Sequence, residues 1–245
     1  MQPMHDPNQN HLLAALSSAE FERASPHLEL MDMPLGGVLC ESGVKLQWAY
    51  FPTTAVVSLR YLMKNGAASE IASVGNEGVI GTAIFMGGNT MLNSAIVHIG
   101  GHGYRLKSSW LMEGFNHSGP MMHLLLRYTQ ALMTQIAQTA VCNRYHSVDQ
   151  QLCRWLLLTL DRMPSGELPM TQELIASILG VRREGITEAA RHLWQAGLIS
   201  YRRGHISVLE RSGLEARACE CYQAVRHEFD RLLCDVRHRQ ELLPF

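Results

Sequence analysis

Two arginines and a glutamate stand together at 182–184, directly before a run with helical apolar spacing. Arginine can pair with guanine through two hydrogen bonds, and glutamate can accept from the amino group of cytosine. We therefore interpret Arg183 and Glu184 as side chains that contact base pairs in the major groove of DNA. Glu188 lies about one turn further along the same helix and is a third expected base contact. An Arg–Glu pair on an ordinary surface helix is the simpler alternative.

A helix-turn-helix is the element that has to position these side chains. Thr171 is the expected N-cap of a first helix, which ends at Leu179 because Gly180 supplies a left-handed residue. A second helical pattern follows at once, with apolar positions from Ile186 to Leu193. Two short helices joined at a glycine form a DNA-reading unit, in which the second helix enters the major groove.

A β-hairpin is expected after the second helix. Residues 198–201 and 205–209 have the character of short strands, and Arg202-Arg203-Gly204 forms the turn between them. A hairpin in this place is typical of a winged helix, and arginines at its tip can neutralise phosphates. A solvated turn is the alternative. The predicted phosphate contacts are Thr171, Arg182, Arg202 and Arg203.

The composition limits the class of protein. Of 245 residues, 47% are hydrophobic and 18% charged, which is not typical of a disordered chain. The formal net charge of −1 means that DNA binding has to come from a local patch. No apolar run reaches the roughly 18–20 residues of a membrane span, and the N-terminus lacks the pattern of a signal peptide. We expect a cytoplasmic protein with no membrane partner. We expect no enzyme, because the P-loop, HExxH, nucleophile-elbow and GxGxxG motifs are absent from the sequence.

The first half of the chain has the pattern of an all-β unit. Between 31 and 107, short β-rich runs alternate with glycine-containing turns at spacings near ten residues, which predicts a β-roll or sandwich. Asn65-Gly66 between two such runs indicates a hairpin.

A long helix is expected to follow the β-rich segment. Residues 120–145 lack glycine and any further proline, and a helix of about 25 residues is roughly 38 Å long. One small roll is too short to cover its apolar face, so we predict a coiled-coil-like seam between two copies of the chain. A core helix in a single globule is the alternative. The predicted seam residues are Leu125, Tyr128, Leu132, Gln135 and Thr139.

The order of these elements resembles the Crp/Fnr family of bacterial regulators over roughly residues 20–211. The resemblance is most specific at 179–187, where Arg183 and Glu184 match the Arg-Glu pair of the family's recognition helix. Gly185 and Glu188 depart from the family pattern, so the preferred half-site is expected to differ. The resemblance implies an α+β fold and a homodimer on a near-palindromic DNA site, with RNA polymerase open as a further partner.

Four segments follow from this reading. They are an N-terminal helix with a β-roll sensor of the cyclic-nucleotide-binding type (a jelly roll) at 1–119, a dimerisation helix at 120–146, a winged helix-turn-helix domain at 147–211, and a helical extension at 212–245. The extension is expected to pack on the DNA-binding domain or on the partner subunit. A ligand-binding or scaffolding protein with a non-functional helix-turn-helix is the alternative to a transcription regulator.

The resemblance also places an effector pocket in the roll. Family members that bind cyclic nucleotides carry a Glu for the ribose and an Arg for the phosphate, and Thr82 and Asn93 stand at these places. Without that cation we expect no cAMP binding. Haem and cyclic di-GMP stay open as effectors. The predicted pocket residues are Gly81, Thr82, Asn93, Ser94 and Gln135.

The six cysteines predict neither a metal site nor a disulfide framework. Their spacing is not that of a paired zinc motif, so idle buried thiols are expected. The iron–sulfur branch of the family uses clustered N-terminal cysteines, and no cysteine precedes Cys40, so no iron–sulfur cluster is expected. Cys219 and Cys221 form the single local cluster in the sequence.

Overall fold

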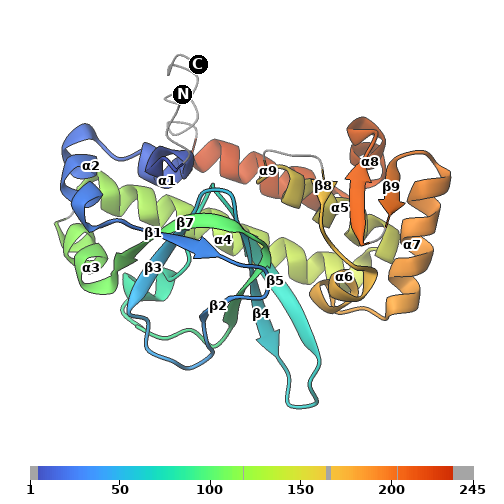
Figure 1. Ribbon diagram of the computed structural model, residues 1–245, viewed down its shortest axis with the longest axis horizontal. Coiled ribbons are helices and arrows are strands. Elements are labelled where there is room, and N and C mark those ends of the chain that lie inside the picture. Colours follow the sequence, from blue (N-terminus) through green and yellow to red (C-terminus); the bar gives the residue numbers. More distant parts are fainter. Residues whose placement is uncertain (1–4, 118, 164–166, 203, 234–245) are drawn as a thin grey trace.

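The computed structural model describes residues 5–117, 119–163, 167–202 and 204–233 (Figure 1). Two short helices and two 3-10 turns precede a β-roll, which contains a third 3-10 turn. The elements of this half are η1 (Pro7–Gln9), α1 (His11–Ala14), α2 (Ser18–Ala24), η2 (Ser25–His27), β1 (Glu29–Met33), β2 (Val38–Cys40), β3 (Trp48–Pro52), β4 (Val56–Leu62), β5 (Ala68–Val74), η3 (Thr82–Ile84), β6 (Ser94–Ile99) and β7 (Gly101–Lys107).

Helices dominate the second half of the chain. Its elements are α3 (Ser108–Asn116), α4 (Pro120–Tyr145), α5 (Val148–Leu160), β8 (Glu167–Leu168), α6 (Gln172–Leu179), α7 (Arg183–Gln195), β9 (Ile199–Arg202), β10 (His205–Val208), α8 (Arg211–Arg217) and α9 (Glu220–Leu232). The predicted α+β architecture, with a roll, a long helix and a C-terminal winged helix-turn-helix, is confirmed. In the described ranges, no helix is both long and apolar enough to cross a membrane.

Two antiparallel sheets build the β-roll, with strand orders β1-β7-β3 and β2-β6-β4-β5. Alternating side chains of these strands, such as Phe51, Val57 and Val97, fill the core between them. The hairpin predicted at Asn65-Gly66 joins β4 to β5. There the Asn65 side chain accepts a hydrogen bond from the Ala67 amide at 3.0 Å, and Gly66 has a φ of 84°.

Helix α4 runs across the length of the molecule, and α9 lies alongside it (Figure 1). One face of α4 packs on the chain's own roll. The Tyr128 hydroxyl donates to the carbonyl of Val79 at 3.1 Å, and the Gln135 amide donates to the carbonyl of Ser73 at 3.3 Å. The ring of Phe229 in α9 meets Tyr128 edge-on, with centroids 6.4 Å apart.

This packing corrects the predicted dimer seam. The seam residues Leu125, Tyr128, Leu132, Gln135 and Thr139 are all buried within one chain, with exposures of 0–7%. They cannot meet a partner, and the alternative of a core helix describes this face of α4. The other side of the helix is exposed and also apolar, with Leu126 at 45%, Met133 at 62% and Val141 at 47%. An apolar repeat identifies a helix face, but it does not tell what covers that face.

The DNA-binding half starts at a capping box. The Ser147 side chain accepts from the backbone amide of Gln150, and the Gln150 side chain accepts from the backbone amide of Ser147. Helices α5, α6 and α7 share a buried core that includes Trp155, Ile178 and Leu193. Strand β8 adds an edge to the wing, giving a sheet of order β8-β10-β9.

The two halves of the chain are in direct contact. Arg162, just after α5, pairs with Glu77 of the roll through Nε and Oε1 at 2.7 Å. Its other nitrogens donate to Ser73 and to Gln135. Nearer the wing, the Arg60 guanidinium of β4 donates to the Ser177 hydroxyl of α6 at 2.7 Å.

Candidate nucleic-acid interface

The turn between α6 and α7 has the geometry that the sequence predicts. The Thr171 hydroxyl accepts from the Leu174 amide at 3.2 Å and caps α6. Gly180 adopts the left-handed conformation with a φ of 68°, and its amide donates to the carbonyl of Ala176. Residue 180 also faces the roll, because a Cβ there would lie 3.0 Å from the hydroxyl of Ser69. A side chain at this position is therefore disfavoured both by conformation and by space.

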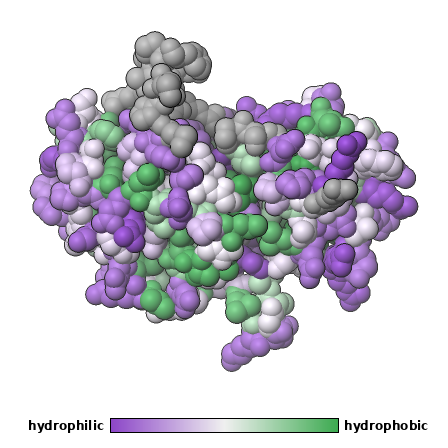
Figure 2. All heavy atoms as spheres, in the orientation of Figure 1, coloured by the Kyte–Doolittle hydropathy of each residue, from purple (hydrophilic) through white to green (hydrophobic). Residues whose placement is uncertain are grey.

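One face of α7 is exposed over its whole length. Arg183, Glu184, Thr187, Glu188 and Arg191 line a single open hollow on it. The end of the molecule that carries α7 is mostly hydrophilic (Figure 2). The structure thus brings the three predicted base-contact residues onto one solvent-facing surface at the tip of the helix-turn-helix.

Two further residues of this face, Thr187 and Arg191, are not among the predicted contacts. Thr187 donates to the Gln172 side chain of α6 at 2.8 Å, which fixes the two helices against each other. Arg191 adds a second cation two turns after Arg183. Spacings of four and eight residues from Arg183 were the available signal, because such residues lie on the same helix face.

Glu188 lies near the imidazole of His192, one turn further along α7. Its Oε1 lies 4.0 Å from Nε2 of His192, and Nδ1 of the same imidazole lies 2.9 Å from the carboxylate of Asp149. Arg183 and Arg191 have no ion-pair partner among the residues that the structure describes.

The predicted phosphate contacts lie around this face. Arg182 is the N-cap residue of α7, and Arg202 ends β9; both are exposed. The wing turn approaches the N-cap of α6, since a Cβ at Gly204 would lie 3.7 Å from Cγ2 of the exposed Thr171. Arg203 lies outside the described residues.

The five residues predicted for the effector pocket lie on several elements of the roll and on α4. Gln135 hydrogen-bonds to Ser73 and Arg162 in the core, and the Ser94 hydroxyl donates to the carbonyl of Arg60. Gly81 and Thr82 lie at η3, and Asn93 is buried just before β6. None of these five residues lines the pocket formed by β2, the loop after it and β3. The alignment to family positions marks corresponding strands, but it does not fix where the roll is hollow.

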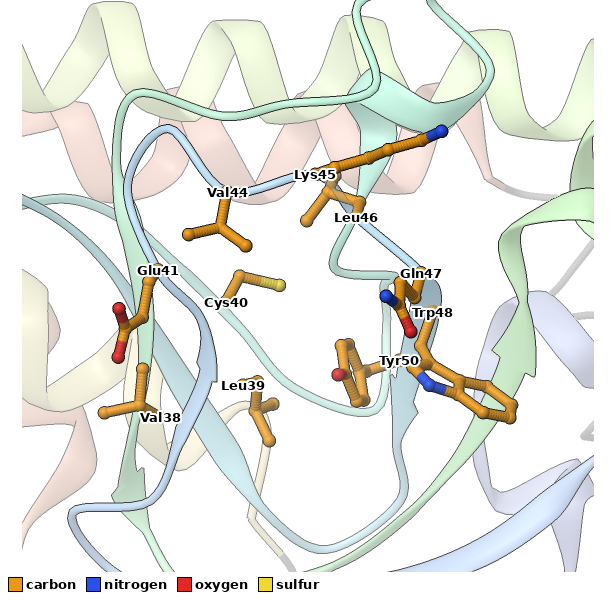
Figure 3. A pocket seen from close by; sticks show the side chains of 10 residues that line it. All are labelled: Val38, Leu39, Cys40, Glu41, Val44, Lys45, Leu46, Gln47, Trp48 and Tyr50. Carbon is orange, nitrogen blue, oxygen red and sulfur yellow. The ribbon is translucent and has the colours of Figure 1, made fainter.

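The pocket in the roll is formed by β2, the loop after it and β3 (Figure 3). It has a volume of about 270 Å³. Cys40 and Tyr50 lie on its inner wall, and Lys45 and Glu41 lie at its rim (Figure 3). Burial raises the pKa of the Cys40 thiol to about 12, so the thiol stays protonated at neutral pH. Burial also raises the pKa of the Tyr50 hydroxyl, so this side chain is uncharged at neutral pH as well.

A cluster of cysteine and histidine side chains lies away from the DNA face. Cys142 and His146 near the end of α4 meet Cys219 and Cys221 at the start of α9. The expectation that these thiols are idle overlooked this arrangement, because 77 residues separate Cys142 from Cys219. Neighbours at i and i+4 on a helix and a C-x-C at the start of another helix were the local signals.

The comparisons agree with this geometry. The model of the Crp-like helix-turn-helix domain matches residues 150–217. Among solved structures, FixK2 from Bradyrhizobium japonicum is 16% identical, with 78% of this chain and 98% of that chain covered and a TM-score of 0.67. A Crp/Fnr-family regulator from Thermus thermophilus is 20% identical, with coverages of 78% and 98% and a TM-score of 0.62. The c-di-GMP-responsive regulator CLP of Xanthomonas campestris is 14% identical, with coverages of 78% and 99% and a TM-score of 0.61.

No curated protein matches the sequence. At these identities the structural neighbours establish the fold, and the family model establishes the domain that carries α6, α7 and the wing. Residues 150–217 are thus a Crp-like helix-turn-helix domain, set in a chain that has the fold of the Crp/Fnr transcription regulators.

Proposed function

We propose that this protein is a sequence-specific, DNA-binding transcription regulator that binds a near-palindromic site as a homodimer. The observation that carries the proposal is the exposed face of α7, where Arg183 and Arg191 flank Glu184 at the tip of a capped helix-turn-helix. In this geometry the N-terminal residues of the second helix reach base edges. The net charge of −1 makes a non-specific electrostatic role a weaker candidate.

The exposed side of α4 supports the homodimer. Met133, Ala137 and Ala140 are exposed at spacings of four and three, and Leu126 lies one heptad before Met133. A 4-3 repeat of apolar residues is typical of the seam of a two-stranded coiled coil. We therefore place the dimer contact on this side of the helix and not on the residues named from the sequence. Two recognition helices would then read half-sites about one helical turn apart.

The base contacts are assigned to Arg183 and Glu184, with Glu188 at the next turn. Arg183 would bind guanine and Glu184 the amino group of a neighbouring cytosine.

Selection from a random DNA library, followed by fluorescence anisotropy with the selected site, tests the proposal. We expect a two-fold symmetric site and an affinity that falls steeply with salt concentration. Equal, weak binding to every sequence would support the second candidate, a ligand-binding or scaffolding protein. That candidate is favoured by one observation, the pocket in the roll.

We propose an effector other than cAMP. Thr82 stands where the cyclic-nucleotide binders of this family carry a carboxylate for the ribose, and Asn93 stands where they carry a cation for the phosphate. The structural neighbour CLP is described as responsive to c-di-GMP. Isothermal titration calorimetry with cAMP and with cyclic di-GMP tests the proposal directly. A micromolar dissociation constant for cAMP would contradict it.

A further inference from the structure

The cluster of Cys142, His146, Cys219 and Cys221, here called the Cys3His cluster, joins two helices far from the DNA face. Each residue contributes one sulfur or nitrogen atom, and these four atoms all lie within 4.8 Å of one another. The three cysteines are buried and form a separate apolar cluster of their own. Helix α9 runs back along α4, so that its first residues lie at the C-terminal end of α4 (Figure 1).

We propose that the Cys3His cluster binds one zinc ion in tetrahedral geometry. A zinc ion with thiolate and imidazole ligands at about 2.3 and 2.0 Å would hold two sulfurs about 3.8 Å apart and a sulfur and a nitrogen about 3.5 Å apart. The Sγ atoms of Cys142 and Cys219 are separated by 3.5 Å, and Sγ of Cys221 lies 3.6 Å from Nδ1 of His146. These two pairs thus lie close to their metal-bound spacing, and the remaining pairs of ligand atoms lie within 4.8 Å.

The surroundings of the cluster also suit a metal ion. Nε2 of His146 lies 3.4 Å from the carboxylate of Glu220, which orients the imidazole so that Nδ1 faces the sulfurs. Three thiolates and a divalent ion leave one net negative charge. The buried guanidinium of Arg154 lies on the same side and donates to Thr139, one turn before Cys142, at 3.1 Å. A cation near the site offsets that charge.

The geometry favours a single ion over the other fates of clustered cysteines. An iron–sulfur cluster would spread its protein ligands over several irons. A disulfide needs sulfurs at about 2.05 Å, which is far shorter than the Cys142–Cys219 separation. Four soft ligands of sulfur and nitrogen are the usual set for a closed structural zinc site.

Such an ion would fix the connection between α4 and α5. Helix α4 ends at Tyr145 and α5 begins at Val148, so two residues connect the long helix to the DNA-binding domain. His146 is one of them and also a ligand. The zinc ion would therefore hold the start of α9 against this connection and fix the angle between α4 and α5.

The metal content of the full-length protein tests the proposal. Protein prepared without a histidine tag and without chelator should contain one zinc ion per chain, as measured by inductively coupled plasma mass spectrometry. Cobalt added to the zinc-free protein should give the thiolate charge-transfer bands and strong visible absorption of tetrahedral cobalt. No zinc after dialysis against zinc, or cobalt bands of an octahedral oxygen site, would overturn the proposal.

Variants assign the ligands. Cys219→Ser and His146→Ala should each retain less than about a tenth of the zinc. Cys40→Ala and Cys153→Ala are the matched controls, because both thiols are buried and lie outside the cluster; these variants should keep the full metal content. Intact zinc in both ligand variants overturns the assignment. An intact mass two daltons low without reductant, together with absent zinc, would show a disulfide in its place.

Discussion

Arg162 and Glu77 form an ion pair that joins the end of α5 to the roll, with an N–O distance of 2.7 Å and exposures of 5% and 14%. Breaking a buried pair by removing one partner leaves a charge without compensation, which costs about 3–5 kcal/mol. Arg162→Met should therefore lower the free energy of unfolding by about 3 kcal/mol in urea titrations. Adding Glu77→Gln should restore part of the loss. The exposed pair Arg105–Glu29 provides the control, since Glu29→Gln should cost less than about 1 kcal/mol. Equal losses in the two pairs would contradict a special role for Arg162.

Glu70 gives the folded protein a defined pH dependence. Burial raises the pKa of this carboxyl to about 7, and Ser58, Arg162 and Arg154 lower it only in part. His98, 3.7 Å away, has its pKa lowered by burial to about 3 and is neutral. The native state thus holds a proton on Glu70 that the unfolded state releases near pH 4.5. The contribution of Glu70 is present below that pH and is lost as the pH rises through about 7.

Glu70→Gln should remove this dependence. The difference in unfolding free energy between the variant and the native protein should grow in favour of the variant by on the order of 3 kcal/mol between pH 4.5 and pH 8. His98 is present in both proteins, so its own loss of stability below about pH 6.5 largely cancels in the comparison. A difference that stays flat over this range would show that Glu70 is ionised at a normal pKa.

Arg183 should determine one base pair of the DNA site. Arg183→Ala should weaken binding to the selected site by about 1–3 kcal/mol and relax the preference at one position of each half-site. Arg202→Ala should weaken all sequences alike and reduce the salt dependence, because a phosphate contact carries no sequence information. If Arg183→Ala weakens every sequence equally, its side chain binds the backbone and not a base.

Met133 and Leu126 should determine the oligomeric state. A glutamate at either position places a charge in the proposed seam, so Met133→Glu and Leu126→Glu should yield monomers in light scattering with native circular dichroism. Leu62→Glu is the control, since Leu62 is 72% exposed at the end of β4, away from α4. Leu132→Ala removes a core side chain and should cost about 2–5 kcal/mol of stability in each chain. Dimers in both glutamate variants would place the contact elsewhere.

Two glycines of the helix-turn-helix should respond to alanine with opposite signs. Gly180→Ala forces a side chain into a left-handed residue 3.0 Å from Ser69 and should destabilise the protein by about 1–2 kcal/mol or more. At Gly185 in α7 a Cβ would make an ordinary contact with Val148 at 3.8 Å. Gly185→Ala should therefore add up to about 1 kcal/mol of stability. Thermal unfolding of both variants measures the two effects.

Local chemistry was readable from the sequence wherever it depends on neighbouring residues. The turn at Asn65-Gly66, the capping box at Ser147 and the left-handed Gly180 each follow from backbone preferences and hydrogen bonds within a few positions. These features were enough to place the roll, the long helix and the winged helix-turn-helix. The exposed face of α7 was predictable as well, except for Thr187 and Arg191.

Features that depend on distant residues were not readable. Both sides of α4 are apolar, and only the packing of the roll and of α9 shows that Leu132 is covered while Met133 is not. The pocket beside Cys40 depends on the path of a loop. The Cys3His cluster depends on α9 returning along α4, which the spacing of the cysteines does not show.

The contacts between roll and DNA-binding domain have a thermodynamic consequence. Arg162 is bound to Glu77, Ser73 and Gln135, and Arg60 reaches α6, so neither half can melt without exposing buried polar groups of the other. Heating should therefore give one cooperative calorimetric peak and not two. A small molecule that occupies the pocket by Cys40 would then stabilise α6 and α7 as much as the roll. If that molecule changes the affinity of the protein for DNA by some factor, DNA bound to α7 must change the affinity for the molecule by the same factor.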